Sequence, residues 1–138
     1  MVKRKPLTRS QVMSRIRGAD TVPELALRRA LREAGIGYRI HAKGLPGRPD
    51  VAFIKARLAV FVHGCFWHRH PGCRHATTPK SNIRFWSDKF SANTSRDRRS
   101  IEALHARGWD VGVIWECETE DVGDLALAVQ EIRERLGR

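Results

Sequence analysis

Three cysteines and a histidine-rich segment carry the most distinctive chemistry of this sequence. Cys65 and Cys73 bracket the segment, Cys117 follows far along the chain, and four of the six histidines lie between positions 63 and 75. An odd number of cysteines argues against a disulfide framework. Zn²⁺ prefers four nitrogen or sulfur ligands in a tetrahedron, and a closed site of this kind is structural. His70, three residues before Cys73, is the favoured fourth ligand. The alternative is three unrelated thiols in the core.

A second candidate site begins at Asp50, which opens an apolar segment. Residues 51–54 and 58–62 are apolar and are joined by a short turn, which predicts a β-hairpin. Such a hairpin brings Asp50 near the backbone of Val62 and the side chain of His63. A carboxylate beside a backbone carbonyl is a pair of hard oxygen ligands that suits Mg²⁺. The hairpin therefore predicts a magnesium site at this edge of the sheet.

Three more side chains could complete that site. His68 could exchange a proton near neutral pH. Glu24 and Asp97 are predicted on flanking helices and could add carboxylates. Each of the two acids also has an alternative role, because Thr21 and Glu24 form the pattern of a capping box and Asp97 lies among arginines that could pair with it on the surface.

Aromatic residues and a strong positive charge indicate a nucleic-acid partner. Phe66 and Trp67 are adjacent inside a polar loop, and Trp86 follows in a segment that mixes basic and aromatic residues. Rings in such a setting can stack on bases or wedge between base pairs. The alternatives are core packing for Trp86 and a cover over the metal site for the other two rings.

The charge is unevenly distributed along the chain. Lys plus Arg number 26 against 15 Asp plus Glu, a net charge of +11, but residues 116–138 are net acidic. A basic front of this kind is typical of a chain that docks a polyanion with one face. The first residues include a basic arm, which we expect to contact DNA phosphates through Lys3, Arg4 and Lys5.

The length of 138 residues corresponds to one domain. The sequence has no run of 18 apolar residues, and no apolar stretch follows the basic N-terminus. We therefore expect neither a membrane span nor a signal peptide, and a cytoplasmic location.

The spacing of apolar residues predicts an α/β domain. Helices are expected over residues 9–17, 21–35, 82–90, 93–107 and 121–136, and strands over 38–41, 51–54, 58–62 and 109–115. This order predicts a small central mixed sheet with helices on both faces and the Cys/His loop at 63–80. We expect one domain over residues 1–138, in which 1–18 form a DNA-contacting arm and short helix and 19–138 the catalytic core.

Several motifs resemble those of the very short patch repair (Vsr) endonucleases, in order and spacing. Between about residue 8 and residue 117 they are Gly47-Arg48-Pro49-Asp50, the run from His63 to Cys73, Phe85-Trp86, Asn93, Arg96-Asp97-Arg98-Arg99, Gly108-Trp109 and Val113-Ile114-Trp115-Glu116-Cys117. The resemblance implies a restriction-endonuclease-like fold with catalytic Mg²⁺ and structural Zn²⁺. It also implies an enzyme that nicks double-stranded DNA 5′ to the thymine of T·G mismatches, which arise by deamination of 5-methylcytosine.

The same resemblance implies a role for individual residues. Asp50 and the backbone of Val62 would bind Mg²⁺, and His68 would be the acid/base group. His63 and Asp97 would be a supporting pair, and Glu24 a further acid. The zinc ligands would be Cys65, His70, Cys73 and Cys117. Phe66, Trp67 and Trp86 would form a wedge that enters DNA from the major groove. Met13 and Ile16 of the first helix would meet it from the minor groove. We expect a monomer that acts together with other DNA repair proteins. We do not expect it to bind a membrane.

Three features depart from the family pattern. Val62 replaces a threonine, which is harmless if the position supplies only its carbonyl. Pro71-Gly72 alters the spacing of the Cys/His loop, which leaves His68 open as an alternative zinc ligand to His70. The Glu-x-Lys sequence common in nucleases of this fold is missing, so a histidine must move the proton. Two other functions fit the same residues: a zinc-stapled DNA-binding module without hydrolysis, and a restriction-type nuclease acting on unmismatched DNA.

Overall fold

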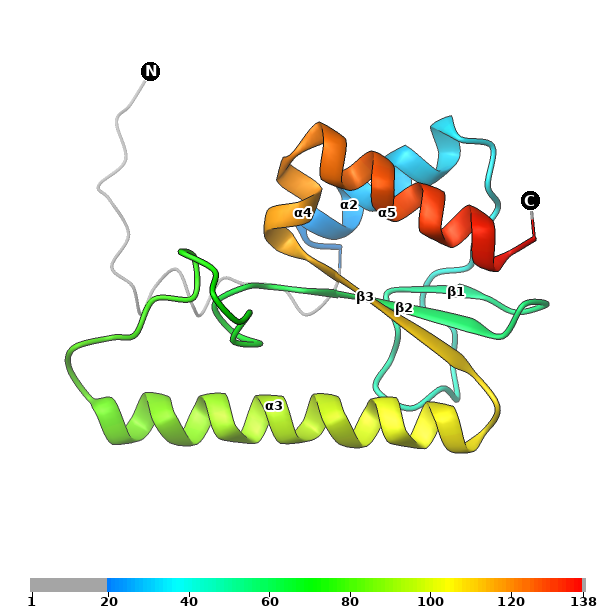
Figure 1. The fold of residues 1–138 in the computed structure, drawn as a ribbon. Coiled ribbons are helices and arrows are strands. Elements are labelled where there is room, and N and C mark those ends of the chain that lie inside the picture. Colours follow the sequence, from blue (N-terminus) through cyan, green and yellow to red (C-terminus); the bar gives the residue numbers. More distant parts are fainter. Residues whose placement is uncertain (1–19, 138) are drawn as a thin grey trace, which may run out of the picture.

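The computed structural model describes residues 20–137 (Figure 1). The predicted helix over 9–17, with Met13 and Ile16, lies outside the described residues. So does the basic arm with Lys3, Arg4 and Lys5. Within residues 20–137, no helix is both long enough and apolar enough to cross a membrane.

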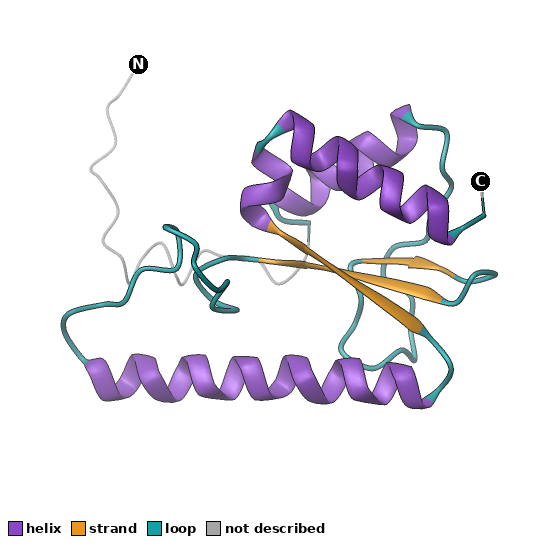
Figure 2. Cartoon of the chain, in the orientation of Figure 1, coloured by secondary structure: helices purple, strands orange, loops and turns teal. Residues whose placement is uncertain are grey.

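A three-stranded mixed sheet forms the centre of the fold (Figure 2). Strand β1 (Val51–Phe53) pairs antiparallel with β2 (Leu58–His63), which confirms the predicted hairpin. Strand β3 (Asp110–Trp115) runs parallel to β2 and sets His63 opposite Trp115.

The stretch predicted as a strand over 38–41 is not one. It contributes a single bridge between Arg39 and Ala52. The backbone of His41 is left-handed, with φ of 52°, which interrupts the extended conformation that a longer pairing needs.

Helices cover both faces of the sheet, as expected (Figure 1). Helix α2 (Val22–Glu33) and helix α5 (Val122–Arg135) lie on one face, and helix α3 (Ile83–Ala106) lies on the other. The larger core lies under α2 and α5 and includes Leu27, Leu31, Val60, Ile114 and Ile132. The smaller core joins Ala59 and Phe61 of β2 to Leu104 of α3.

Helix α3 is one helix of 24 residues, whereas the sequence predicts two, over 82–90 and 93–107. The two merge because no glycine or proline occurs between residues 83 and 106 to break the backbone hydrogen bonds. Only Leu104, near its C-terminal end, is buried. The first half of α3 extends past the sheet and lies below the Cys/His loop (Figure 1).

A short helix, α4 (Glu116–Glu120), follows β3 directly and was not expected. It places Cys117 at the end of the strand, where the chain turns toward α5. Asp121 then caps α5 by accepting a hydrogen bond from the Asp124 N–H at 2.9 Å.

Candidate active site and metal centre

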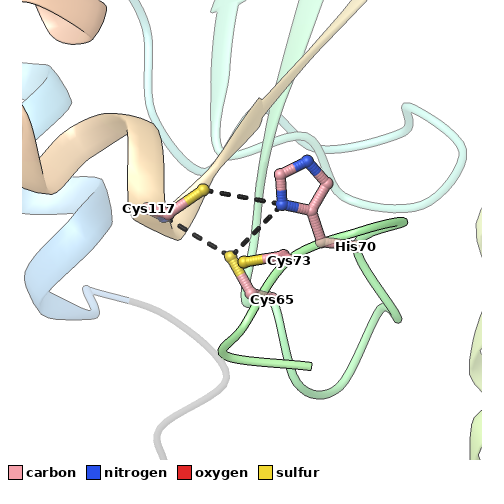
Figure 3. A group of neighbouring side chains, drawn as sticks. All are labelled: Cys65, His70, Cys73 and Cys117. Carbon is pink, nitrogen blue, oxygen red and sulfur yellow. Dashed lines mark hydrogen bonds between the residues drawn. The ribbon is translucent and has the colours of Figure 1, made fainter. Parts of the chain in front are cut away.

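Four nitrogen and sulfur ligands converge between the loop after β2 and the start of α4 (Figure 3). One donor atom each from Cys65, His70, Cys73 and Cys117 lies within 4.8 Å of the other three. The Nδ1 atom of His70 is 3.7 Å from the Cys65 sulfur and 3.5 Å from the Cys117 sulfur. The His70 ring also stacks on Trp115, with ring centroids 4.2 Å apart.

These spacings fit a tetrahedral zinc ion. Zinc bonded to sulfur at about 2.3 Å and to nitrogen at about 2.0–2.1 Å sets sulfur and nitrogen ligands about 3.6 Å apart. Burial raises the pKa of the Cys65 thiol to about 12 and raises that of Cys117. Buried thiols of this kind would lose their protons to a bound metal. The cluster could therefore hold zinc.

Asp50 lies where the loop before β1 meets the end of β2. Its N–H donates to the Val60 carbonyl at 3.0 Å, and its Oδ2 atom accepts the Val62 N–H at 2.6 Å. The preceding loop reaches this place because Gly47 is left-handed and lies so close to Ser100 that a Cβ would be 2.5 Å from it. Burial, and secondarily the nearby Glu24, raise the pKa of Asp50 to about 7.

Glu24 is held from several sides on the first turn of α2. Its carboxylate accepts the Asp20 N–H at 2.9 Å, the Thr21 hydroxyl at 3.1 Å and the Arg28 guanidinium at 3.2 Å. The predicted capping box is wrong in its bonding, because Thr21 donates its hydroxyl to Glu24 instead of accepting a backbone N–H. Glu24 is 4 % exposed and lies next to Asp50. It could therefore still serve as the further active-site acid that the resemblance implies.

Two histidines and a carboxylate form a second group of candidate catalytic side chains. The Nδ1 atom of His68 lies 2.5 Å from Oδ2 of Asp97, and the His68 ring stacks on His63 with centroids 4.0 Å apart and planes within 5°. Asp97 is thus hydrogen-bonded to His68, and both members of the expected supporting pair, His63 and Asp97, lie against the His68 ring. Burial, and secondarily the nearby His68, lower the pKa of His63 to about 4.

The donor atoms of His63, His68 and Asp97 also lie within 4.8 Å of one another, as metal ligands would. The lone pair of an imidazole nitrogen lies in the plane of its ring. Because the two rings are parallel, their lone pairs do not converge on one ion. The arrangement suits an oriented proton-transfer group better than a metal site.

The two carboxylates and the group of two histidines and Asp97 open into one cleft of about 1030 Å³. Its lining includes Glu24, Asp50, His63, His68 and Asp97, which the sequence spreads over more than seventy positions. Two carboxylates beside the Val62 backbone offer hard oxygen donors of the kind that Mg²⁺ prefers. The cleft thus combines candidate metal ligands with a candidate proton donor or acceptor.

An aromatic cluster closes the cleft on the side of α3. Phe66 contacts Trp67, Trp86 and Phe90, with ring centroids 5.5, 5.6 and 5.2 Å apart, and Phe85 contacts Trp86 at 5.3 Å. Phe66 and Trp67 also line the cleft. Trp86 therefore packs with the two loop rings outside both hydrophobic cores, so the alternative of core packing is wrong for Trp86.

Sequence reasoning missed three participants. Arg28 follows Glu24 by four residues and Phe90 follows Trp86 by four, and both spacings place partners on one face of a helix. Glu116 lines the cleft, and its Oε1 atom accepts the Cys65 N–H at 3.3 Å. Glu116 lies within the family motif at 113–117 but was given no role, because its position in the cleft depends on the unexpected helix α4.

The mixed sheet, the oxygen-rich cleft and the cysteine–histidine cluster are those of a small α/β nuclease. The chain has the fold of the "Homing Endonuclease I-Bth0305I Catalytic Domain", with a TM-score of 0.54 and 22% identity over 84% of this chain and 94% of that one. Residues 2–74 match the family described as "DNA mismatch endonuclease Vsr".

Two relatives extend this match over most of the chain. The "Type II nicking enzyme V.XorIIP" of Xanthomonas oryzae pv. oryzae is 46% identical over 92% of this chain and 93% of its own. The "DNA mismatch endonuclease Vsr" of Escherichia coli K12 is 39% identical over 94% of this chain and 81% of its own. The chain belongs to the Vsr family and is a DNA endonuclease, a hydrolase of phosphodiester bonds.

Proposed function

We propose that this endonuclease nicks duplex DNA 5′ to the thymine of a T·G mismatch and so starts very short patch repair of deaminated 5-methylcytosine. The observation that carries the proposal is the shared cleft, in which Asp50 and Glu24 face the His68–Asp97 pair beside a cluster of aromatic rings. The names of the two relatives, a mismatch endonuclease and a nicking enzyme, support the same activity.

Asp50 and the Val62 carbonyl would hold a Mg²⁺ ion, with Glu24 close by. When bound, this ion supplies a Lewis acid for the scissile phosphate. Asp50 is already fixed for this task by the Val62 N–H. Glu24 is held by Arg28, which fixes the direction of its carboxylate.

His68 would move the proton. Its bond to Asp97 occupies Nδ1 and orients the ring, so proton exchange falls to Nε2. His63 supports the ring by stacking, and its lowered pKa keeps His63 neutral, so it places no positive charge beside His68.

Phe66, Trp67 and Trp86 would form the wedge that enters the base stack. A mismatched pair stacks poorly, so prying it open costs less, and the enzyme selects it by deformability. Zinc at Cys65, His70, Cys73 and Cys117 would make the supporting loop rigid. Met13 and Ile16 would meet the wedge from the minor groove, and Lys3, Arg4 and Lys5 would contact phosphates, within a single domain over residues 1–138.

The deciding experiment compares nicking of labelled duplexes that carry T·G, T·A or C·G at one position, with Mg²⁺ and with EDTA. We expect cleavage of one strand of the T·G duplex, only with Mg²⁺. Equal cleavage of all three duplexes would instead indicate a restriction-type nuclease. Binding without any cleavage would indicate a zinc-stapled DNA-binding module.

A further inference from the structure

Arg69, next to His70 in the Cys/His loop, ties the two ends of that loop together. Its guanidinium donates to the carbonyls of Thr77 at 2.9 Å and Ala76 at 3.1 Å, to the Thr78 hydroxyl at 3.3 Å and to the Phe66 carbonyl at 3.4 Å. All four acceptors are neutral, so these bonds do not cancel the charge of the side chain. The rigid fork of a guanidinium can bind several acceptors in fixed directions, which a lysine cannot do.

The same guanidinium lies over the aromatic cluster. Its central carbon is 4.1 Å from the centroid of the Phe90 ring and 5.7 Å from that of Phe66. Phe90 belongs to α3, whereas Phe66 belongs to the loop. Arg69 therefore contacts the rings on both sides of the junction between the loop and the helix.

Farther along α3 the His68–Asp97 hydrogen bond also joins the loop to the helix, but near Trp86 and Phe90 the junction has little other support. In α3 only Leu104 is buried, and it lies near the opposite end of the helix from Trp86 and Phe90. The first half of α3 meets the loop through ring contacts among Phe66, Trp67, Trp86 and Phe90. A side chain that bonds the loop backbone and stacks on Phe90 fixes the relative positions of those rings.

We propose that Arg69 is a positioning residue that sets the geometry of the aromatic cluster and thereby the discrimination between mismatched and matched DNA. The inference rests on the proposed function, because it concerns how the wedge is held. It assigns to Arg69 a role distinct from phosphate binding, since both terminal nitrogens of the guanidinium already donate to the protein itself. It also predicts that the role depends on the guanidinium group and not on positive charge alone.

The test compares Arg69→Lys and Arg69→Ala with Lys89→Ala. Lys89 is a suitable control because its ammonium lies 5.9 Å from the Phe85 ring of the same cluster but does not tie the loop backbone. For each variant, kcat and KM are measured on T·G and T·A duplexes, together with zinc content. We expect both Arg69 variants to lose about 10-fold in preference for T·G, with zinc retained, and Lys89→Ala to keep the parent's preference.

Arg69→Lys is the decisive variant, because it keeps the charge. If it retained the parent's preference, Arg69 would act as a charge only and the proposal would be overturned. An equal loss on both duplexes would also overturn it. Acrylamide quenching of tryptophan fluorescence in the DNA-free protein gives an independent readout, and it should increase in both Arg69 variants but not in Lys89→Ala. That readout stands even if the parent shows no mismatch preference, so failure of the proposed function and failure of this inference remain distinguishable.

Discussion

The cysteine–histidine cluster and the carboxylate–histidine cleft both form where β2 and β3 end, but they are built in opposite ways. In the cluster, four soft donors face one another at ligand spacing, and Trp115 stacks on the histidine. In the cleft, hard oxygen donors and imidazoles line about 1030 Å³ of open space, and the side chains of His68 and Asp97 are 28 % and 23 % exposed.

This contrast separates stability from chemistry. A closed set of ligands leaves no room for a substrate, so a metal bound there can only hold segments together. An open set with raised or lowered pKa values is suited to exchange ligands and protons. Substitutions in the cluster should therefore affect folding first, and substitutions in the cleft should affect catalysis first.

The largest effect is expected for Cys117→Ser. Binding of structural zinc contributes about 10–16 kcal/mol in small zinc domains, and removal of one of the four ligands forfeits a large part of it. We expect loss of zinc and a large decrease in the melting temperature, measured by elemental analysis and by thermal unfolding. If the variant lacked zinc but kept the parent's stability, the cluster would not be a stabilising metal site.

Asp50→Asn should abolish nicking and leave the fold intact. The amide can still accept the Val62 N–H but lacks the charge that binds Mg²⁺. Nicking rate, zinc content and binding to a T·G duplex should be measured together. We expect zinc and DNA binding to persist, and nicking near the parent's rate would show that Asp50 is not in the active site.

His68→Ala should reduce the nicking rate by about 10²–10⁴-fold, the usual contribution of general acid–base catalysis. Zinc content should not change, because the ring nitrogen nearest the thiols belongs to His70. The informative comparison is His70→Ala, which should lose zinc. If His68→Ala lost zinc and His70→Ala kept it, His68 would be the zinc ligand in place of His70.

Arg28→Met tests the support behind the cleft. It leaves the buried Glu24 without its guanidinium partner, which typically costs about 3–5 kcal/mol. Urea unfolding should show this loss in Arg28→Met and not in Arg29→Met, because Arg29 is exposed on the same helix. Equal stability of the two variants would mean that Glu24 is protonated or solvated in the native protein.

The smallest effect concerns pH. The pKa of Asp50 is raised from 3.8 to about 7, so between these values the folded protein binds a proton that the unfolded chain does not, and the free energy of unfolding falls as pH rises. The pKa of His63 is lowered from 6.5 to about 4, so its contribution rises with pH and opposes that of Asp50.

Asp50→Asn removes the first of these opposing contributions. Without added Mg²⁺, the stability of the variant relative to the parent should increase as the pH rises from 4 to 7 and level off above pH 7. Thermal unfolding of both proteins across this range measures the difference. A constant difference across the range would contradict the raised pKa of Asp50.

The sequence predicted those parts of the fold and site that depend on rare residue types or local spacing. Cysteines are few, so Cys65, Cys73 and Cys117 stood out, and the apolar runs on either side of a turn predicted the hairpin that positions Asp50. The contact between Asp50 and Glu24 was less accessible, because it depends on how α2 packs on the sheet. Arg28 is a charged residue that is 7 % exposed, and only its tertiary surroundings explain that burial.

Helix boundaries were predicted less well where no residue forces a break. Nothing in the local sequence around Ser91 and Ala92 ends a helix, and the continuity of α3 could have been read from that absence. By contrast, α4 has five residues and too few turns to show a periodic pattern. The position of Glu116 in the cleft follows from α4 and could therefore not be predicted from the sequence.

The parallel pairing of β2 with β3 also constrains the order of events during folding. His63 and Trp115 are opposite one another, and Cys65 and Cys117 follow them by two residues each, 52 positions apart in the chain. Parallel strands join only after a long connection has been closed, which makes their pairing slow. A slip of one residue would turn the end of β3 to the wrong face. Capture of a metal by all four ligands would therefore be a late step, and it would stabilise only the correct register of the sheet during biosynthesis.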